Sequence, residues 1–322
     1  TPMITSMLMF LMVALSASIQ AEQAGTPEQV GETGSVFDGK LKKVSGGFEF
    51  TEGPAPDGRG RIWFTDIARS QILRCDEDGS IHTVMERTDG CNGLQFDKDG
   101  RLVACQGQKG RVVRIDPATK KITPLVTMYE DSPFITTNDL ALDQHGGVYF
   151  TDPAYWRNPD STLDEAVYYS DSGGKVTRIL DGFRRPNGIL LSPDMKTLYV
   201  LPAGQPELMA YSITSPGVLG KGGRLAKLEG GGDGLTCDTL GTLYITQPRS
   251  RKILVIDPDG SIIESVDVPE GPSNCTIGGT EFDTLYITAR TGLYSIKLNR
   301  TGIRTAHGQE SKDGSAGDDA SD

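Results

Sequence analysis

The stretch Asn92-Gly-Leu-Gln-Phe-Asp-Lys-Asp-Gly-Arg-Leu-Val-Ala104 carries the pattern that decides the fold. A polar residue opens a short apolar run, an Asp/Gly turn follows, and a second β-rich run comes next. The segment from Asp233 to Thr246, which begins Asp-Gly-Leu-Thr-Cys, repeats the same order. Two such runs around a turn predict an antiparallel hairpin.

The opening polar residue recurs along most of the chain. The set is Glu52, Asn92, Asn138, Asn187, Asp233 and Asn274. Subtracting successive residue numbers gives spacings of 40, 46, 49, 46 and 41 residues. A period of this length, with four strand-like pieces per repeat, is typical of a β-propeller. The sequence therefore predicts an all-β fold, a six-bladed propeller with four antiparallel strands per blade.

Composition and length define the expected domains. The 322 residues include 40 glycines, which favours short strands and tight turns over helices. We expect a signal peptide over residues 1–21, a linker over 22–37, the propeller over 38–304 and a disordered tail over 305–322. The tail is predicted from its Ser, Asp and Gly content.

The first segment bears on localisation. Residues 7–18 form an apolar run too short to span a bilayer, and Ala21 follows before a polar stretch. This resembles a secretory signal peptide without its positively charged start, and a periplasmic or secreted location follows. The alternatives are an artefactual N-terminus or an anchor. If the segment is not a signal peptide, the protein is expected in the cytoplasm.

Charge and missing motifs exclude several functions. The net charge of −11 argues against nucleic-acid binding, which needs a cationic surface. Of the three histidines none forms an HExxH motif, and there is no G-x-S-x-G elbow, P-loop or G-x-G-x-x-G. We expect a small-molecule substrate, no stable membrane span after signal removal, and a monomer or weak dimer.

The cysteines and the acidic turns both invite a simpler interpretation. Cys75, Cys91, Cys105, Cys237 and Cys275 form no CxxC pair, and most lie in strand-like runs, so we expect buried thiols. A disulfide between Cys91 and Cys105, which flank one predicted hairpin, is the alternative. Three Asp-x-Asp-Gly pieces look like calcium loops and start at Asp76, Asp97 and Asp257. Their twelfth positions are Met85, Gln106 and Val266, none of which is the required Glu, so we interpret them as hairpin turns.

Strand direction assigns the loops to two faces of the propeller. The recurring polar residues open the innermost strand, so they and the loops after each second strand share one face, here called the ligand face. The Asp-x-Asp-Gly turns then lie on the opposite face. Gln106, Tyr155 and Arg290 are candidate substrate contacts by their place on ligand-face loops. The stretch 153–174 is the longest such segment and is predicted to be either a lid or a tolerated surface insertion.

If each repeat is one blade, the six recurring residues converge at one end of the central channel. Two carboxylates and four amides form an oxygen-rich set suited to a hard cation. Glu52 and Asp233 are flanked by glycine in apolar surroundings, and buried carboxylates need a cation or donors. For Asn92 and Asn274 we prefer a turn residue bonded to its own backbone.

Five motifs in register resemble one known family. They are Phe50-Thr-Glu-Gly-Pro54, Thr137-Asn-Asp-Leu140, Tyr149-Phe-Thr-Asp-Pro153, Arg185-Pro-Asn-Gly188 and Gly232-Asp-Gly-Leu235. Together they resemble the senescence-marker-protein/gluconolactonase/luciferin-regenerating family. The resemblance implies a six-bladed propeller with a divalent metal on its axis, held by Glu52, Asn187 and Asp233, with Asn138 near the metal or substrate. Calcium is the first expectation, with zinc, magnesium and manganese as alternatives.

The resemblance also implies a chemistry. We expect a metal-dependent, gluconolactonase-type hydrolase that opens a sugar lactone, with the metal as Lewis acid and Asp233 as general base. A phosphotriesterase-like or other ester hydrolase on the same site, and a non-catalytic binding platform, are the alternatives. One position departs from the animal branch of the family. Thr136 stands where those lactonases carry an Arg that contacts the sugar acid.

Overall fold

A computed structural model of the chain describes residues 34–304. The predicted signal peptide, most of the linker and the predicted C-terminal tail lie outside the described residues. One compact unit begins at Ser35 and contains all the strands. In the described range no helix is both long and apolar enough to cross a membrane.

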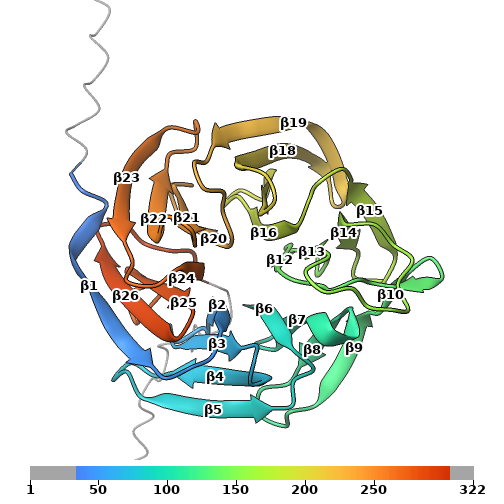
Figure 1. The fold of residues 1–322 in the computed structure, drawn as a ribbon, viewed down its shortest axis with the longest axis horizontal. Coiled ribbons are helices and arrows are strands. Elements are labelled where there is room, and N and C mark those ends of the chain that lie inside the picture. The colour runs from blue at the N-terminus through green and yellow to red at the C-terminus, as the bar shows by residue number, and fades with distance from the viewer. Residues whose placement is uncertain (1–33, 305–322) are drawn as a thin grey trace, which may run out of the picture. The chain divides into compact units, whose positions relative to one another are not determined.

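Six antiparallel sheets of four strands stand around a common axis, which confirms the predicted six-bladed propeller (Figure 1). The first blade is β2 (Thr51–Pro56), β3 (Ile62–Asp66), β4 (Gln71–Cys75) and β5 (Ile81–Glu86). The second is β6 (Cys91–Phe96), β7 (Leu102–Gln106), β8 (Arg111–Ile115) and β9 (Ile122–Val126). The third is β12 (Leu140–Leu142), β13 (Val148–Asp152), β14 (Ala166–Ser170) and β15 (Val176–Leu180).

The other three blades follow the same order from the axis outward. The fourth is β16 (Pro186–Leu191), β17 (Thr197–Pro202), β18 (Glu207–Ser215) and β19 (Val218–Lys227). The fifth is β20 (Leu235–Cys237), β21 (Leu243–Gln247), β22 (Lys252–Ile256) and β23 (Ile262–Asp267). The sixth is β24 (Pro272–Gly278), β25 (Thr284–Ala289), β26 (Gly292–Leu298) and β1 (Phe37–Gly46).

The sixth blade closes the ring with a strand from the other end of the chain. β1 pairs antiparallel with β26, from Phe37 opposite Leu298 to Gly46 opposite Gly292. The sequence analysis did not foresee this pairing, because β1 precedes the first repeat and carries no ring residue. Ring closure removes the free edge that an open row of blades would leave.

Two short elements lie outside the blades. A 3-10 turn (Gly107–Lys109) follows β7, and a two-stranded ribbon of β10 (Met128–Tyr129) and β11 (Ser132–Pro133) connects the second blade to the third.

Apolar side chains pack between neighbouring blades. One cluster contains Val103 of the second blade and Phe150 and Tyr168 of the third blade. It also contains Phe134 of the segment that leads into the third blade. The Phe134 and Phe150 rings meet edge to face at 5.0 Å between centroids. Burying one such side chain contributes about 1.5–3 kcal/mol. The blades are therefore held mainly by packing, which leaves the axis free for polar residues.

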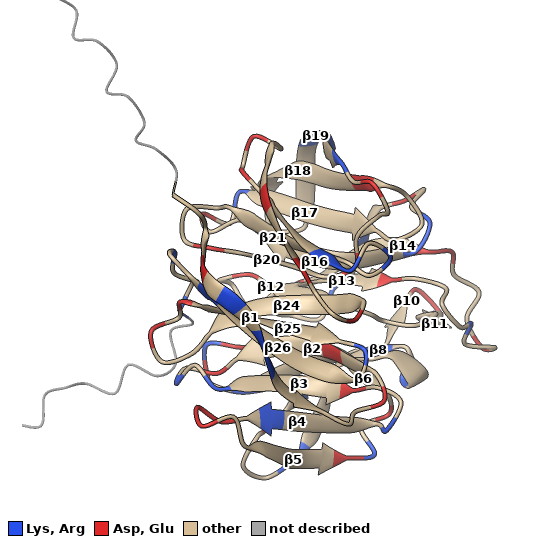
Figure 2. Cartoon of the chain, turned by 60° about the vertical axis from the view of Figure 1, so that its left-hand side comes forward, with Lys and Arg blue, Asp and Glu red and all other residues tan. Residues whose placement is uncertain are grey.

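The opposite face carries the acidic turns, as predicted from strand direction. The turns that begin at Asp76 and Asp257 join the third and fourth strands of their blades, and the turn at Asp97 joins the first two. Each is closed by a bond from its glycine N–H to the first Asp carbonyl, for example Gly100 to Asp97 at 3.0 Å. Figure 2 shows most charged positions in loops and at strand ends. All five cysteines are buried and free, which excludes the Cys91–Cys105 disulfide in this structure.

Candidate active site on the propeller axis

The innermost strands β2, β6, β12, β16, β20 and β24 surround the axis (Figure 1). Each recurring polar residue lies at or just before the start of one of these strands, on the ligand face. Backbone hydrogen bonds link these positions from blade to blade. Gly93 N–H donates to the Asn138 carbonyl at 2.9 Å, and Gly188 N–H donates to the Asp233 carbonyl at 2.9 Å. Each ring side chain is thus placed by the neighbouring blade.

This close approach explains the glycine that follows each ring residue in the Glu-Gly, Asn-Gly and Asp-Gly pairs. Gly53 has φ +48°, and a Cβ there would lie 1.9 Å from the Asn92 carbonyl oxygen. At Gly188 the added atom would meet the Asp233 carbonyl oxygen at 2.4 Å. In these motifs the polar residue serves the site, and the glycine is required by backbone contact between blades.

Glu52 and Asp233 bring two carboxylates into this site. Glu52 is 5% exposed, and its Oε2 accepts a 2.9 Å bond from its own neighbour, the Gly53 N–H. Asp233 keeps some exposed surface, but its Oδ1 is buried and has no hydrogen-bond partner among the described residues. Burial and the Asp233 carboxylate raise the pKa of Glu52 well above its usual range. Burial and the nearby Asp139 carboxylate likewise raise the pKa of Asp233.

Asp139 is a third carboxylate of the site, and the sequence analysis did not single it out. It is 8% exposed, accepts the Leu140 N–H at 2.9 Å, and accepts Asn274 Nδ2 at 3.3 Å. Burial raises its pKa to about 6. Because it follows Asn138 directly, it belongs to the Asn-Asp-Leu motif. Three buried carboxylates around one axis make a strongly negative centre.

The amide ring residues have different surroundings. Asn274 Oδ1 accepts the Cys275 N–H at 2.8 Å, which is the predicted bond to its own backbone, while its Nδ2 faces Asp139. Asn92 and Asn138 are both buried on the axis, at 7% and 6% exposure.

Asn187 connects the carboxylates to Tyr155. Its Nδ2 donates to the Tyr155 hydroxyl at 2.5 Å, and its side chain also hydrogen-bonds Asp233. Burial and the Asp233 charge raise the Tyr155 pKa. The predicted residues Glu52, Asn187, Asp233 and Tyr155 are therefore close together in space.

Tyr155 stands on the loop of residues 153–165, between β13 and β14. The stretch predicted as one long segment to 174 is interrupted by β14, so the loop is shorter than expected. Several bonds hold it down. Thr136 Oγ1 donates to the Trp156 carbonyl, Asn158 Nδ2 donates to the Phe134 carbonyl at 3.2 Å, and Glu165 Oε1 accepts the Ala154 N–H at 2.7 Å. Thr136, at the departure from the animal branch, thus supports the loop.

The structure gives Gln106 a different place from the one predicted. It is fully buried, its Nε2 donates to the Thr88 carbonyl at 2.9 Å, and its Oε1 accepts Arg111 Nε at 2.6 Å. In this conformation it has no surface with which to contact a substrate. Asp152 ends the equivalent strand of the third blade and is buried in the same way, accepting the Ile135 and Thr136 N–H groups. That equivalence was visible in the sequence.

Arg290 is exposed in the ligand-face turn after β25, with φ +43°. Its carbonyl accepts the Thr51 N–H at 2.8 Å, directly beside Glu52. The predicted residue is therefore near the rim, although its side chain makes no contact with the carboxylates.

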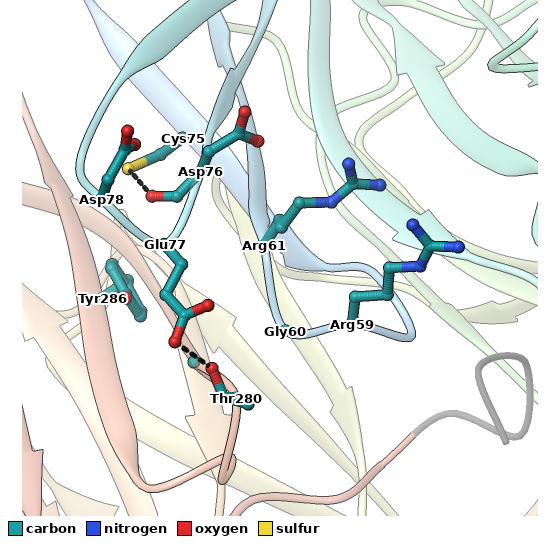
Figure 3. A pocket seen from close by; sticks show the side chains of 10 residues that line it. Arg59, Gly60, Arg61, Cys75, Asp76, Glu77, Asp78, Thr280 and Tyr286 are labelled. Carbon is teal, nitrogen blue, oxygen red and sulfur yellow. Dashed lines mark hydrogen bonds between the residues drawn. The ribbon is translucent and has the colours of Figure 1, made fainter. Parts of the chain in front are cut away.

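Two hollows open on the opposite face. One, of about 540 Å³, lies over the first and sixth blades and is lined by Arg61, Asp76 and Glu77 among others (Figure 3). Its charged groups are engaged, since Glu77 accepts Thr280 Oγ1 at 2.7 Å and Arg61 pairs with Asp57. The other, of about 530 Å³, is the far half of the central channel, with Asp139 and Asn274 at its inner end.

The donor set on the axis fits a hard cation. A buried carboxylate oxygen without a donor, beside two more carboxylates, is the environment that a divalent ion stabilises. No cluster of three or more His, Cys, Asp or Glu side chains in residues 34–304 is arranged as a metal site by itself. A cation here would take amide oxygen from Asn187 as well as carboxylate oxygen.

Comparison with known proteins places this geometry in a family. The model of the SMP-30/gluconolactonase/LRE-like region matches residues 50–291. A gluconolactonase from Zymomonas mobilis is 29% identical over 81% of this chain and 82% of its own length. A solved gluconolactonase from Xanthomonas campestris is 28% identical, with TM-score 0.75 over 80% of this chain and 89% of that one.

A further solved structure, a calcium-binding regucalcin from Agrobacterium tumefaciens, shares the fold. Its TM-score is 0.72 at 20% identity, over 84% of this chain and 96% of that one.

Proposed function

The chain belongs to the SMP-30/gluconolactonase/LRE-like family, and we propose that it hydrolyses a sugar lactone with a divalent cation on the propeller axis. Lactone hydrolysis is the activity named for the similar proteins from Zymomonas mobilis and Xanthomonas campestris. The observation that carries the proposal is the buried, undonated Oδ1 of Asp233 beside Glu52 and Asn187.

We assign Glu52, Asn187 and Asp233 to hold the cation. Calcium is the first choice because the donors are oxygens only, and magnesium or manganese fit better than zinc. When bound, the cation supplies Lewis acidity toward the lactone carbonyl.

The chain's own residues supply the remaining steps. Asp233 takes a proton from the attacking water through one carboxylate oxygen. Holding the cation lowers the basicity of this carboxylate, so Asp233 acts as a weak base toward the activated ester. The bond between the carbonyl carbon and the ring oxygen then breaks, and that oxygen leaves as a hydroxyl after receiving the proton. The product is the open-chain hydroxy acid.

Substrate position is assigned to Asn138 and to the loop of residues 153–165. Asn138 is buried beside the three carboxylates, and the Tyr155 hydroxyl is bonded to Asn187. A substrate that enters from the ligand face would therefore meet Tyr155 before it reaches the carboxylates.

A hydrolysis screen tests this proposal. The chain is stripped of metal, reloaded separately with calcium, magnesium, manganese and zinc, and assayed on aldonolactones, aryl esters and organophosphates. We expect lactones to be the best substrates and chelation to abolish turnover. Preferred hydrolysis of organophosphates would instead favour a phosphotriesterase-like enzyme. No turnover of any compound would favour a binding platform.

A further inference from the structure

Most arginines of the ligand face lack a carboxylate partner, although Arg69 and Arg111 on that face pair with acidic residues. In the described residues, seven arginines have no carboxylate within ion-pair distance. They are Arg185 together with Arg87, Arg157, Arg184, Arg249, Arg251 and Arg290. All seven lie in ligand-face loops, either between blades or after a second strand. On the opposite face, Arg61, Arg74, Arg101 and Arg114 are each paired with Asp.

Three carboxylates of the ligand face are engaged by backbone groups. Asp66 accepts the Glu49 and Phe50 N–H groups, and Asp152 accepts those of Ile135 and Thr136. Glu165 accepts the Ala154 and Arg185 N–H groups. A chain of net charge −11 therefore presents unpaired guanidinium groups around the entrance to its site. A guanidinium group without a carboxylate partner is free to bind an anion.

Arg185 is the one of these that touches the site. Its guanidinium lies over the Tyr155 ring, 5.5 Å from the ring centroid, and Tyr155 is bonded to Asn187. Arg185 is also two residues before Asn187 in the chain. An arginine stacked on an aromatic ring keeps its hydrogen-bonding edge free for a carboxylate or phosphate.

The backbone fixes Arg185 in a strained conformation. Its φ is +56°, which non-glycine residues rarely adopt. Its N–H donates to Glu165 Oε1 at 3.1 Å, and its carbonyl accepts the Ala203 N–H at 2.8 Å. Contacts on both sides hold the strain, which is typical of functional positions.

We propose that Arg185 anchors an anionic group of the substrate, so that the preferred substrate is a lactone carrying a carboxylate or phosphate away from the reacting ester. This inference rests on the proposed lactone hydrolysis. It also gives this chain a substitute for the sugar-acid contact that position 136 lacks, because Thr136 instead supports the loop that carries Tyr155.

The kinetic test compares Arg185→Gln with Arg184→Gln on three lactones. Arg184 is exposed, and among the described residues its side chain hydrogen-bonds only the Gly204 carbonyl. Its substitution removes the same charge, so it is the matched control. The lactones are neutral gluconolactone, glucarolactone and phosphorylated gluconolactone, of which the last two separate carboxylate from phosphate recognition. Arg185→Gln should raise KM about tenfold or more for at least one anionic lactone, with kcat within about twofold. Neutral gluconolactone and Arg184→Gln should show changes under about twofold.

Further readouts exclude a merely structural effect. Arg185→Lys keeps the charge but loses the planar guanidinium group. Its KM for the anionic lactones should lie between the values of the native chain and Arg185→Gln. Rising salt should weaken turnover of the anionic lactones in the native chain and much less in Arg185→Gln. Equal losses on neutral and anionic lactones, or equal losses in both glutamine variants, would overturn the proposal.

A binding measurement separates this inference from the proposed function. Calorimetric titration of the metal-loaded protein uses glucarate, phosphorylated gluconate and uncharged sorbitol. We expect at least one anion to bind about tenfold more weakly to Arg185→Gln than to Arg184→Gln, and sorbitol to show no such difference. If the native chain hydrolyses no lactone, the proposed function fails while this result still decides the role of Arg185. If anion binding does not depend on Arg185, the inference about Arg185 is wrong and the proposed function is unaffected.

Discussion

Asp233 and Glu52 share one axis and one sign of charge, yet their surroundings assign them different tasks. Glu52 accepts a hydrogen bond from the Gly53 N–H, whereas Asp233 keeps an undonated oxygen and some exposed surface. In the proposed mechanism the buried Oδ1 of Asp233 faces the cation, and proton transfer needs a carboxylate that water can approach, which the exposed surface of Asp233 allows. Asp233 meets this requirement better than Glu52.

The first prediction compares Asp233→Asn with Glu52→Gln. Each variant removes one negative charge and keeps one oxygen ligand. At saturating metal, with occupancy measured, Asp233→Asn should lose about 10²-fold or more turnover beyond the loss in Glu52→Gln. Stopped-flow or steady-state hydrolysis gives the comparison. Similar losses in the two variants would show that Asp233 is a ligand only.

The second prediction concerns the two faces. Asn187→Ala removes the bonds to Tyr155 and Asp233 and should weaken metal binding about 10- to 100-fold. Asp99→Ala and Asp259→Ala alter turns on the opposite face, where Asp259 Oδ1 caps the Ser261 N–H. Those two should keep turnover within about twofold and change thermal stability little. Metal titration, initial rates and thermal melts of all three variants distinguish the faces.

Single residues show where sequence reasoning stopped. Glu52, Asn187 and Asp233 could be found because each opens a repeat, and the period alone aligned them. Asp139 was missed because it stands one place after a ring residue. Its position on the axis depends on the local backbone conformation, which residue spacing does not predict. Gln106 was chosen by its loop position, but it is the counterpart of Asp152, whose carboxylate binds the incoming chain.

At the scale of elements, the innermost strands are positioned by contact between blades. After four of the six ring residues the chain approaches its neighbour so closely that only glycine fits, at Gly53, Gly93, Gly188 and Gly234. A repeat can therefore be recognised from a pair such as Asn-Gly without any knowledge of the site. The loop of residues 153–165 could not be foreseen in this way, because β14 and the anchoring bonds are properties of the third blade alone.

The third prediction separates close approach from backbone strain. Gly53→Ala places a methyl group against the Asn92 carbonyl and should cost more than about 2 kcal/mol of unfolding free energy. Gly39→Ala is the control, since its φ is also positive, at +94°, but the added atom meets nothing within 4 Å. That variant should cost on the order of 1 kcal/mol, from strain alone. Denaturant unfolding monitored by circular dichroism measures both, and equal costs would contradict the inter-blade explanation.

At the scale of the whole propeller unit, the spacing of the recurring polar residues predicted the number of blades. The order of strand-like runs and turns predicted the number of strands per blade, and the described structure has both. Ring closure was not predicted, because the closing strand β1 lies outside the repeats and its partner β26 lies about 250 residues further along the chain. The closed ring has an energetic consequence. It brings Glu52, Asp139 and Asp233 toward one axis. The packing between blades that stabilises the ring is therefore accompanied by electrostatic repulsion among these carboxylates.

The last prediction follows from that repulsion. In the metal-free protein the pKa values of Glu52, Asp233 and Asp139 are all raised by burial, that of Asp139 to about 6. A carboxyl whose folded pKa lies above its unfolded value stabilises the fold most below about pH 4, and this contribution is lost as pH rises through the folded pKa. Chelated protein should therefore lose stability between about pH 4 and 7 at this site. A bound cation favours the ionised carboxylates and should cancel the loss.

The measurement is the difference in Tm between metal-saturated and chelated protein from pH 5 to 8. Taking the difference cancels the contribution of other carboxylates to the pH dependence of Tm. Examples are Asp76 and Asp194, whose pKa values are lowered by their partners in both states. We expect the Tm difference to widen as pH rises, and metal binding near pH 6 to release protons into a weakly buffered solution. In Asp233→Asn the widening should be smaller, because one of the three carboxyls no longer titrates. A Tm difference independent of pH, without proton release, would mean that the cation binds away from these carboxylates, and the site on the axis would then have to be abandoned.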